Sequence, residues 1–178
     1  MSATKGVEVD LKGVIRSVKD FPKPGIMFRD ITTLIADGAA MRYAVDKLAA
    51  EAKARKAEVI LAAESRGYIF GAAVAYKLGL PLVIVRKPGK LPYKTIRHTY
   101  ELEYGKDTLE IHRDAVEKGR RVLVVDDVLA TGGTLVGACK LVEKLGGVVA
   151  GCACLVELSF LKGRARLKGR DLFCLVRY

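Results

Sequence analysis

The segment RVLVVDDVLATGGTLVGACKLVEKLGGVVAGCACLV, residues 121–156, constrains the fold more than any other part of the chain. It begins with an apolar run that ends in two acids, Asp126 and Asp127, and continues through a short Thr/Gly turn. Apolar residues then recur at helical spacing until Gly146 and Gly147, and a second apolar run follows. A strand, a helix and another strand in this order are typical of a parallel sheet with crossover helices.

The same alternation extends over most of the chain, so we expect one α/β domain over residues 1–178 with a largely parallel central sheet flanked by helices. Asp37 stands where it can cap a helix, and Gly79 followed by Pro81 ends another helix. The predicted elements are a helix with an apolar stripe over 41–52, a strand at 58–64, a helix at 68–79 and strands at 82–86, 121–127, 148–156 and 171–178.

A segment of another type separates these units. Residues 87–95, KPGKLPYKT, contain two prolines and a glycine and predict a mobile loop. Residues 99–113 alternate polar and apolar side chains around Gly105, which predicts a β-hairpin. The two histidines, His98 and His112, fall in this region without a metal-ligand partner at useful spacing, and we assign them no chemistry.

Composition excludes several classes of protein. Apolar residues make up 51% of the chain, which favours a globular protein over a disordered one. The longest nearly apolar stretch, residues 145–156, falls short of the ~20 residues that cross a bilayer, and the first residues lack the apolar core of a secretory signal. We therefore expect a cytoplasmic protein that does not contact membranes. The four cysteines lack metal-binding spacing, so we expect reduced, structural thiols.

The chain is strongly basic, with 31 Lys and Arg against 20 Asp and Glu and a net charge of +11. Such a charge suits an anionic partner. The basic residues are spread over distant segments and form no Arg-rich tail, so we expect small phosphorylated ligands and regard nucleic acid as an unlikely partner. The size of the positive charge has no explanation in the sequence.

Polar clusters follow three of the predicted strands, namely residues 64–67 (ESRG), 86–90 (RKPGK) and 126–134 (DDVLATGGT). In open α/β sheets, ligands bind outside the carboxyl ends of the strands. The turn ATGGT leads into a helix, and its backbone N–H groups favour a phosphate. It lacks the lysine of a P-loop and the spacing of a dinucleotide-binding loop. An ordinary strand-to-helix turn is the alternative.

Asp126 and Asp127 lie directly before this anion-attracting turn. A carboxylate near a bound phosphate is costly unless it has hydrogen-bond donors or a cation of its own. Ribose hydroxyls are such donors, and a phosphate-bound Mg²⁺ is such a cation. The pair therefore suits a sugar phosphate, with a helix-capping pair or a surface pair as the alternative.

Residues 122–134, VLVVDDVLATGGT, resemble the phosphoribosyl pyrophosphate (PRPP) motif of type I phosphoribosyltransferases. Five further segments resemble the adenine phosphoribosyltransferase family, in that family's order, and together they cover nearly the whole chain. They are FPKPGIMFRDIT (21–32), ESRGYIFGAA (64–73), VRKPGKLP (85–92), YELEYGKDTLEIH (100–112) and LVELSFLKGR (155–164). One departure is Tyr68, where the family more often has Phe.

This resemblance implies the type I phosphoribosyltransferase fold, with a small hood and base-recognition segment at residues 1–35 and a flexible lid and hairpin at residues 87–113. It implies transfer of the phosphoribosyl group from PRPP to adenine, forming AMP and pyrophosphate in purine salvage, with Mg²⁺ as cofactor. A homodimer is also implied.

The resemblance also implies roles for individual residues. Asp126 and Asp127 would hold the ribose and contribute indirectly to metal binding, and Arg66 and Lys87 would bind pyrophosphate, with Arg66 also assisting catalysis. Glu103 would handle the ring proton of the base. Tyr104 would shape the closed site. The 5′-phosphate would be held by Ala130, Thr131, Gly132, Gly133 and Thr134, and the adenine by Met27, Phe28, Arg29 and Leu158.

Two alternatives stay open. A transferase for guanine, xanthine or hypoxanthine would carry the same PRPP motif, and only the base-recognition segment and ELEYG (101–105) argue against it. A non-catalytic regulator that senses PRPP or nucleotides is the second. Such a regulator usually carries a nucleic-acid-binding segment, and the sequence contains no helix-turn-helix module.

Overall fold

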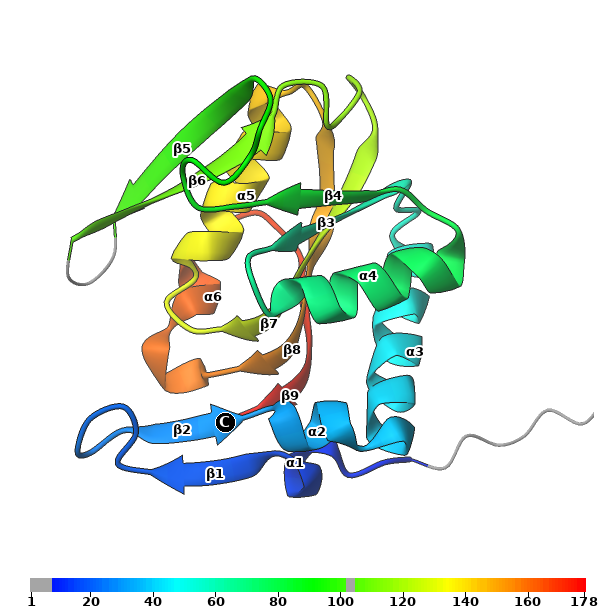
Figure 1. The fold of residues 1–178 in the computed structure, drawn as a ribbon. Helices are drawn as coiled ribbons and strands as arrows, with labels where there is room; N and C mark the ends of the chain where they lie inside the picture. The colour runs from blue at the N-terminus through cyan, green and yellow to red at the C-terminus, as the bar shows by residue number, and fades with distance from the viewer. Residues whose placement is uncertain (1–7, 102–104) are drawn as a thin grey trace, which may run out of the picture. The chain divides into compact units, whose positions relative to one another are not determined.

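The computed structural model describes residues 8–101 and 105–178, and the chain forms two compact units, Met1–Asp46 and Lys47–Tyr178 (Figure 1). The expected hood, residues 1–35, falls within the first unit. None of the helices in the described part of the chain is long and apolar enough to cross a bilayer.

The first unit is built around a short antiparallel hairpin that the sequence did not predict. Strand β1 (Arg16–Lys19) pairs with β2 (Met27–Asp30), with Val18 opposite Phe28. Arg16 Nη2 lies 2.5 Å from Asp30 Oδ2 across the pair. A hydrogen bond from the Thr32 side chain, followed by that from Arg16, lowers the pKa of Asp30 to about 2. The ion pair joins the ends of the two strands, and the bond from Thr32 fixes the Asp30 carboxylate.

Helices precede and follow this hairpin. They are α1 (Leu11–Val14), α2 (Thr32–Ala36) and α3 (Gly38–Ala54). The Asp37 carboxylate accepts the N–H groups of Ala39 and Ala40 at 2.9 and 3.0 Å. The predicted cap of this helix is therefore confirmed, and it satisfies two donors that a helix start leaves open.

The second unit contains a five-stranded sheet, and all its strand pairs are parallel. The strands lie in the order β4-β3-β7-β8-β9. All five strands were predicted. Their bounds are β3 Val59–Ala63, β4 Leu82–Val85, β7 Arg121–Leu129, β8 Val148–Glu157 and β9 Leu172–Arg177.

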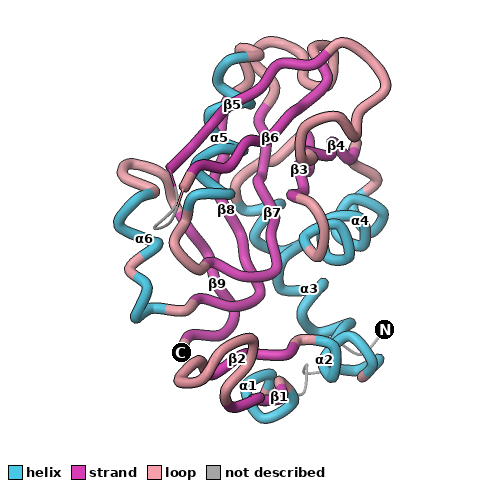
Figure 2. Tube along the Cα trace, turned by 60° about the vertical axis from the view of Figure 1, so that its left-hand side comes forward, coloured by secondary structure: helices cyan, strands magenta, loops and turns pink. Residues whose placement is uncertain are grey.

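Helices cover both faces of this sheet (Figure 2). Gly71 of α4 (Gly67–Leu78) packs so closely on Ala62 that an added Cβ would lie 2.6 Å from the Ala62 Cβ. The neighbouring strand residue, Leu61, is part of a different set of contacts, the core cluster that includes Leu135 of α5 (Gly133–Lys144). Since neighbouring strand residues point to opposite faces, α4 and α5 lie on opposite sides. The short 3₁₀ helix η1 (Ser159–Leu161) and α6 (Gly163–Arg166) follow β8.

The predicted hairpin is confirmed as β5 (Thr95–Glu101) and β6 (Lys106–His112), which are antiparallel and pack against α5, but β5 begins four residues before the predicted start at Thr99. In β7, however, the predicted end at Asp127 is wrong by two residues. Val128 and Leu129 continue the strand because they stay in register with Val156 and Glu157 of β8. All four cysteines are free thiols, and Cys139, Cys152 and Cys154 are buried.

Candidate functional site

The strand order places a switch point between β3 and β7. From β3 the chain crosses through α4 to β4 on one side, and from β7 it crosses through α5 to β8 on the other. Doubly wound sheets bind ligands in the crevice at such a point. A cavity of about 310 Å³ lies there, lined by Glu64, Ser65, Arg66, Asp126, Asp127, Val128, Ala130 and Thr134. The structure thus joins two of the polar clusters that the sequence analysis identified.

Asp126 and Asp127 form a buried acid pair at this cavity, with 7% and 5% of their surfaces exposed. The Asp127 N–H donates to Asp126 Oδ1 at 2.9 Å. Burial, and then the neighbouring charge of Asp127, raises the pKa of Asp126 well above its usual range. The ionised form of Asp126 is therefore unfavourable without further donors or a cation.

One cation already faces the pair. Arg66 Nε lies 2.7 Å from Asp127 Oδ2. That oxygen is buried and accepts no hydrogen bond of good geometry among the described residues. Asp127 therefore keeps capacity to accept a hydrogen bond from a ligand hydroxyl or to face a bound cation.

Gly67 is the residue that lets the start of α4 approach this pair. A Cβ at Gly67 would lie 2.8 Å from Asp126 Oδ1 and 3.2 Å from the Val125 carbonyl oxygen. Any side chain would therefore push Arg66, its neighbour in the chain, away from Asp127. Gly67 lies in ESRG, but no role for it is apparent from the sequence, because its constraint comes from a strand about 60 residues away.

The Thr/Gly turn forms the other side of the site. Gly132 precedes α5 with a left-handed φ of 84° and provides no side chain to cap the helix. The first N–H groups of α5 are thus available to an anion, in the direction that the helix dipole favours. Thr131, Gly132 and Thr134 line a smaller hollow of about 50 Å³ here. Gly133 is the buried first residue of the helix.

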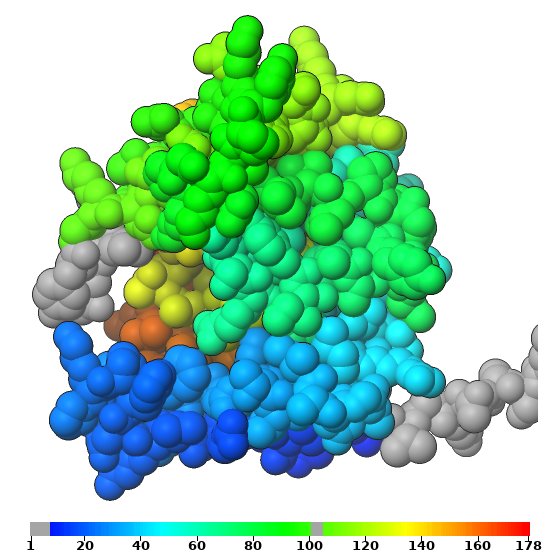
Figure 3. All heavy atoms as spheres, in the orientation of Figure 1, coloured from blue at the N-terminus to red at the C-terminus, as the bar shows by residue number. Residues whose placement is uncertain are grey.

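The first residue of α6 packs against the backbone of this turn. A Cβ at Gly132 would lie 2.6 Å from the Gly163 carbonyl oxygen, and a Cβ at Gly163 would overlap the Ala130 carbonyl oxygen. In the space-filling view, the yellow atoms of residues in the 130s lie beside the orange atoms of the 160s (Figure 3). Gly163 lies in LVELSFLKGR (155–164), but its contact with this turn is not apparent from the sequence.

Gly163→Ala is expected to displace the turn at Ala130 and to destabilise the chain by about 1–3 kcal/mol, as overpacking of a tight contact does. Urea unfolding measures the loss. Gly38→Ala is the matched control, because Gly38, like Gly163, is the first residue of a helix and has no left-handed φ, but an added Cβ there meets no atom within 4 Å. Equal losses in the two variants would show that the contact with Ala130 is not the cause.

The RKPGK segment is organised by Glu64. The carboxylate accepts the Lys87 N–H at 2.9 Å, and its ion pairs are with Lys90 and with Arg86 at 3.5 Å. Burial opposes ionisation, but the bonds from Lys90, the Lys87 N–H and Arg86 outweigh it and lower the pKa of Glu64 to about 2. Lys87 itself is not in the lining of the 310 Å³ cavity. Its ammonium group pairs with Asp107 of β6, a residue without a role in the sequence analysis.

The remaining expected residues belong to three other segments. Met27, Phe28 and Arg29 all lie in β2 of the first unit, where Phe28 packs edge-on against Phe21 at 5.1 Å between ring centroids. In the second unit, the Leu158 N–H donates to the Leu129 carbonyl oxygen at 2.9 Å, beside the end of β7. Glu103 and Tyr104 lie outside the described residues.

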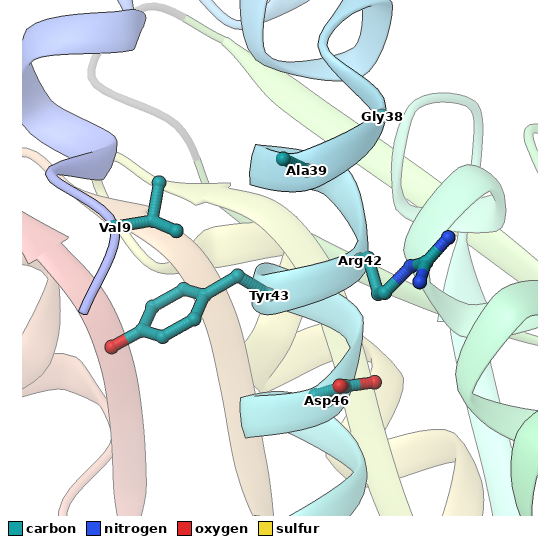
Figure 4. A pocket seen from close by; sticks show the side chains of 6 residues that line it. All are labelled: Val9, Gly38, Ala39, Arg42, Tyr43 and Asp46. Carbon is teal, nitrogen blue, oxygen red and sulfur yellow. The ribbon is translucent and has the colours of Figure 1, made fainter. Parts of the chain in front are cut away.

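Another hollow, of about 390 Å³, lies in the first unit around α3 (Figure 4). Val9 and Tyr43 lie on one side of the helix and Arg42 on the other. None of these residues follows a strand of the parallel sheet, and we assign the hollow no chemistry.

Known phosphoribosyltransferases are similar to this chain. The phosphoribosyl transferase domain model matches residues 32–175. A curated adenine phosphoribosyltransferase of Desulfitobacterium hafniense is 53% identical over 96% of this chain and 98% of its own length. Among solved structures, that of adenine phosphoribosyltransferase from Thermoanaerobacter pseudethanolicus is similar with a TM-score of 0.91 and 51% identity, covering 95% of this chain and 98% of that one. The Saccharomyces cerevisiae enzyme, solved with an imino-altritol bisphosphate and adenine, is similar with a TM-score of 0.88 and 36% identity, covering 93% and 96%.

Proposed function

This chain belongs to the phosphoribosyltransferase family, and on that premise we propose that the crevice between β3 and β7 is where it binds PRPP. The chain is an enzyme that transfers the phosphoribosyl group from PRPP to adenine and forms AMP and pyrophosphate, a reaction of purine salvage. The observation that carries the proposal is the buried acid pair beside the open start of α5.

The Thr/Gly turn provides the contacts for the 5′-phosphate in this proposal. Backbone N–H groups from Ala130 to Thr134 and the hydroxyls of Thr131 and Thr134 donate to the phosphate oxygens. Asp126 and Asp127 accept hydrogen bonds from the ribose hydroxyls, which add donors to the acid pair. The site thereby separates the phosphate from the two carboxylates by the length of the sugar.

At the other end of the sugar, pyrophosphate leaves. Arg66 and Lys87 are the proposed cations for it, because developing negative charge on a leaving group is stabilised by fixed positive groups. Arg66 lines the cavity directly, next to Asp127. Lys87 contributes from the segment that Glu64 organises.

The chemistry of the site also fits Mg²⁺. Carboxylate oxygens suit this ion, and Asp127 Oδ2 is buried and accepts no well-directed hydrogen bond from the residues that the structure describes. No group of three or more His, Cys, Asp or Glu in the described part of the chain could cage a metal. We therefore propose that Mg²⁺ arrives with the diphosphate of PRPP and that Asp126 and Asp127 face it indirectly. When bound, it neutralises charge on the diphosphate.

The base end of the site rests on the family resemblance. Met27, Phe28 and Arg29 are proposed for adenine recognition, and Leu158 for an apolar contact with the base. Glu103 is the proposed acid–base group for the ring proton, with Tyr104 shaping the closed site. Residues 87–113 are the proposed lid, which excludes water from an oxocarbenium-like centre. Residues 1–35 are the proposed hood of a single domain.

A homodimer that works in the cytoplasm is part of the same proposal, on the strength of that resemblance. Light scattering on the purified chain tests the dimer, for which the mass must be twice 19.3 kDa.

Turnover with each purine tests the activity. With PRPP and Mg²⁺, adenine is expected to give AMP and pyrophosphate, and guanine, hypoxanthine and xanthine much less product. A clear preference for guanine would contradict the substrate assignment. Tight nucleic-acid binding without any turnover would favour the regulatory alternative.

A further inference from the structure

Lys87 is proposed to bind a polyanion, yet its ammonium group pairs with a carboxylate. The partner is Asp107 Oδ2, and the same oxygen accepts the Tyr100 hydroxyl at 2.9 Å. A carboxylate beside Lys87 offsets the positive charge that attracts pyrophosphate, so by itself it would weaken the binding of pyrophosphate. The contacts of Asp107 indicate a role that compensates for this effect.

The carboxylate of Asp107 is fixed by several contacts. Its other oxygen, Oδ1, accepts the Thr108 N–H at 2.8 Å. Burial opposes its ionisation, but the bonds from Lys87, Tyr100 and the Thr108 N–H outweigh it and lower the pKa of Asp107. Burial in turn raises the pKa of Tyr100 to about 12. At neutral pH, Asp107 is therefore an anion and the Tyr100 phenol is a donor.

Tyr100 connects this carboxylate to the phosphate-binding turn. It faces Asp107 across the β5–β6 pair, and its hydroxyl lies 3.5 Å from Thr134 Oγ1. Its ring packs directly on α5, since a Cβ at Gly137 would lie 2.9 Å from Tyr100 Cδ1. The Asp107 carboxylate of the hairpin thus connects to the segment after β4 through Lys87 and to the first turn of α5 through Tyr100.

We propose that Asp107 is a positioning residue that holds the Lys87 ammonium in place for pyrophosphate and ties it, through Tyr100, to the turn at Thr134. The proposal rests on the functions proposed above for Lys87 and Thr134. A free lysine side chain has many rotamers, and ordering one on binding costs about 0.5–1.5 kcal/mol. Asp107 orders the Lys87 side chain before PRPP binds, so the free energy of binding does not include the entropic cost of ordering it.

Asp107→Asn keeps the size of the side chain and an oxygen for Tyr100, but removes the charge that holds Lys87. The KM for PRPP and the Kd for pyrophosphate are expected to rise about 3- to 10-fold, the range that the cost of ordering a side chain implies. The KM for adenine and kcat are expected to stay within about twofold. The matched control is Asp114→Asn, an exposed aspartate that follows β6 and whose change removes the same charge. A fall in the KM for PRPP would show that Asp107 competes with pyrophosphate, and would overturn the proposal.

A double-mutant cycle separates positioning from general support of the fold. In a Lys87→Ala background, Asp107→Asn is expected to have no further effect on the KM for PRPP. Additive effects would overturn the proposal. If Lys87→Ala alone left PRPP binding unchanged, both the role of Lys87 and this inference would fail. If it weakened binding and Asp107→Asn did not, only the inference would fail.

Tyr100→Phe is the second variant if Asp107→Asn does not fold. It keeps the ring on Gly137 and removes only the hydroxyl. A rise of about 2- to 3-fold in the KM for PRPP, close to the lower end of the same range, with kcat unchanged, supports the link to Asp107. An unchanged KM for PRPP would overturn it.

Discussion

Asp127→Asn is expected to raise the KM for PRPP by about 10- to 100-fold, because a hydrogen bond to a charged group contributes about 1.5–3 kcal/mol. Two effects combine in this variant. The ribose hydroxyls lose a charged acceptor, and Arg66 loses the carboxylate that faces it at 2.7 Å. Steady-state kinetics with varied PRPP and saturating adenine measures the change.

The control for this variant is again Asp114→Asn, which removes one negative charge from an exposed position. Its KM for PRPP is expected to match that of the unmodified chain. If both variants raised the KM equally, loss of charge would explain the effect and the contact with ribose would not. An Asp127→Asn variant with an unchanged KM would remove Asp127 from the site.

Glu103→Ala is expected to lower kcat by about 10²–10⁴-fold, the usual contribution of general acid–base catalysis, with little change in KM. Glu103 lies outside the described residues, and its role derives from its place in ELEYG (101–105). The limb of the pH–rate profile that reports its ionisation is expected to disappear with the side chain. Single-turnover measurements of AMP formation separate this chemical step from product release.

Glu117→Ala is the matched control, because this side chain is 82% exposed in an ion pair with Arg120. It is expected to leave kcat and the pH–rate profile unchanged. A Glu103→Ala variant with full kcat would mean that another group handles the ring proton of adenine.

The sequence predicted the sheet because its strands appear as continuous apolar runs, and the central strands β3 and β7 are buried on both faces. β3, for example, is buried along its whole length. The first hairpin escaped prediction for the opposite reason. β1 and β2 have four residues each and are exposed or half-buried throughout, so no alternation of apolar and polar residues marks them.

In the candidate site, the sequence predicted those features that depend on residues adjacent in the chain. Asp126 and Asp127 precede an anion-binding turn, and that combination is visible in adjacent residues. Gly163 and Asp107 could not be found in this way, since their constraints come from Ala130 and Lys87, each about 20 to 30 residues distant in the chain. Such residues become apparent only when the hairpin register and the packing of α6 are known.

A crystal structure of the chain with AMP and Mg²⁺-pyrophosphate tests the central claim most directly. We expect the 5′-phosphate within hydrogen-bond distance of the N–H groups from Thr131 to Thr134, with the ribose hydroxyls on Asp126 and Asp127. AMP bound elsewhere, with the turn and the acid pair free of ligand, would contradict it.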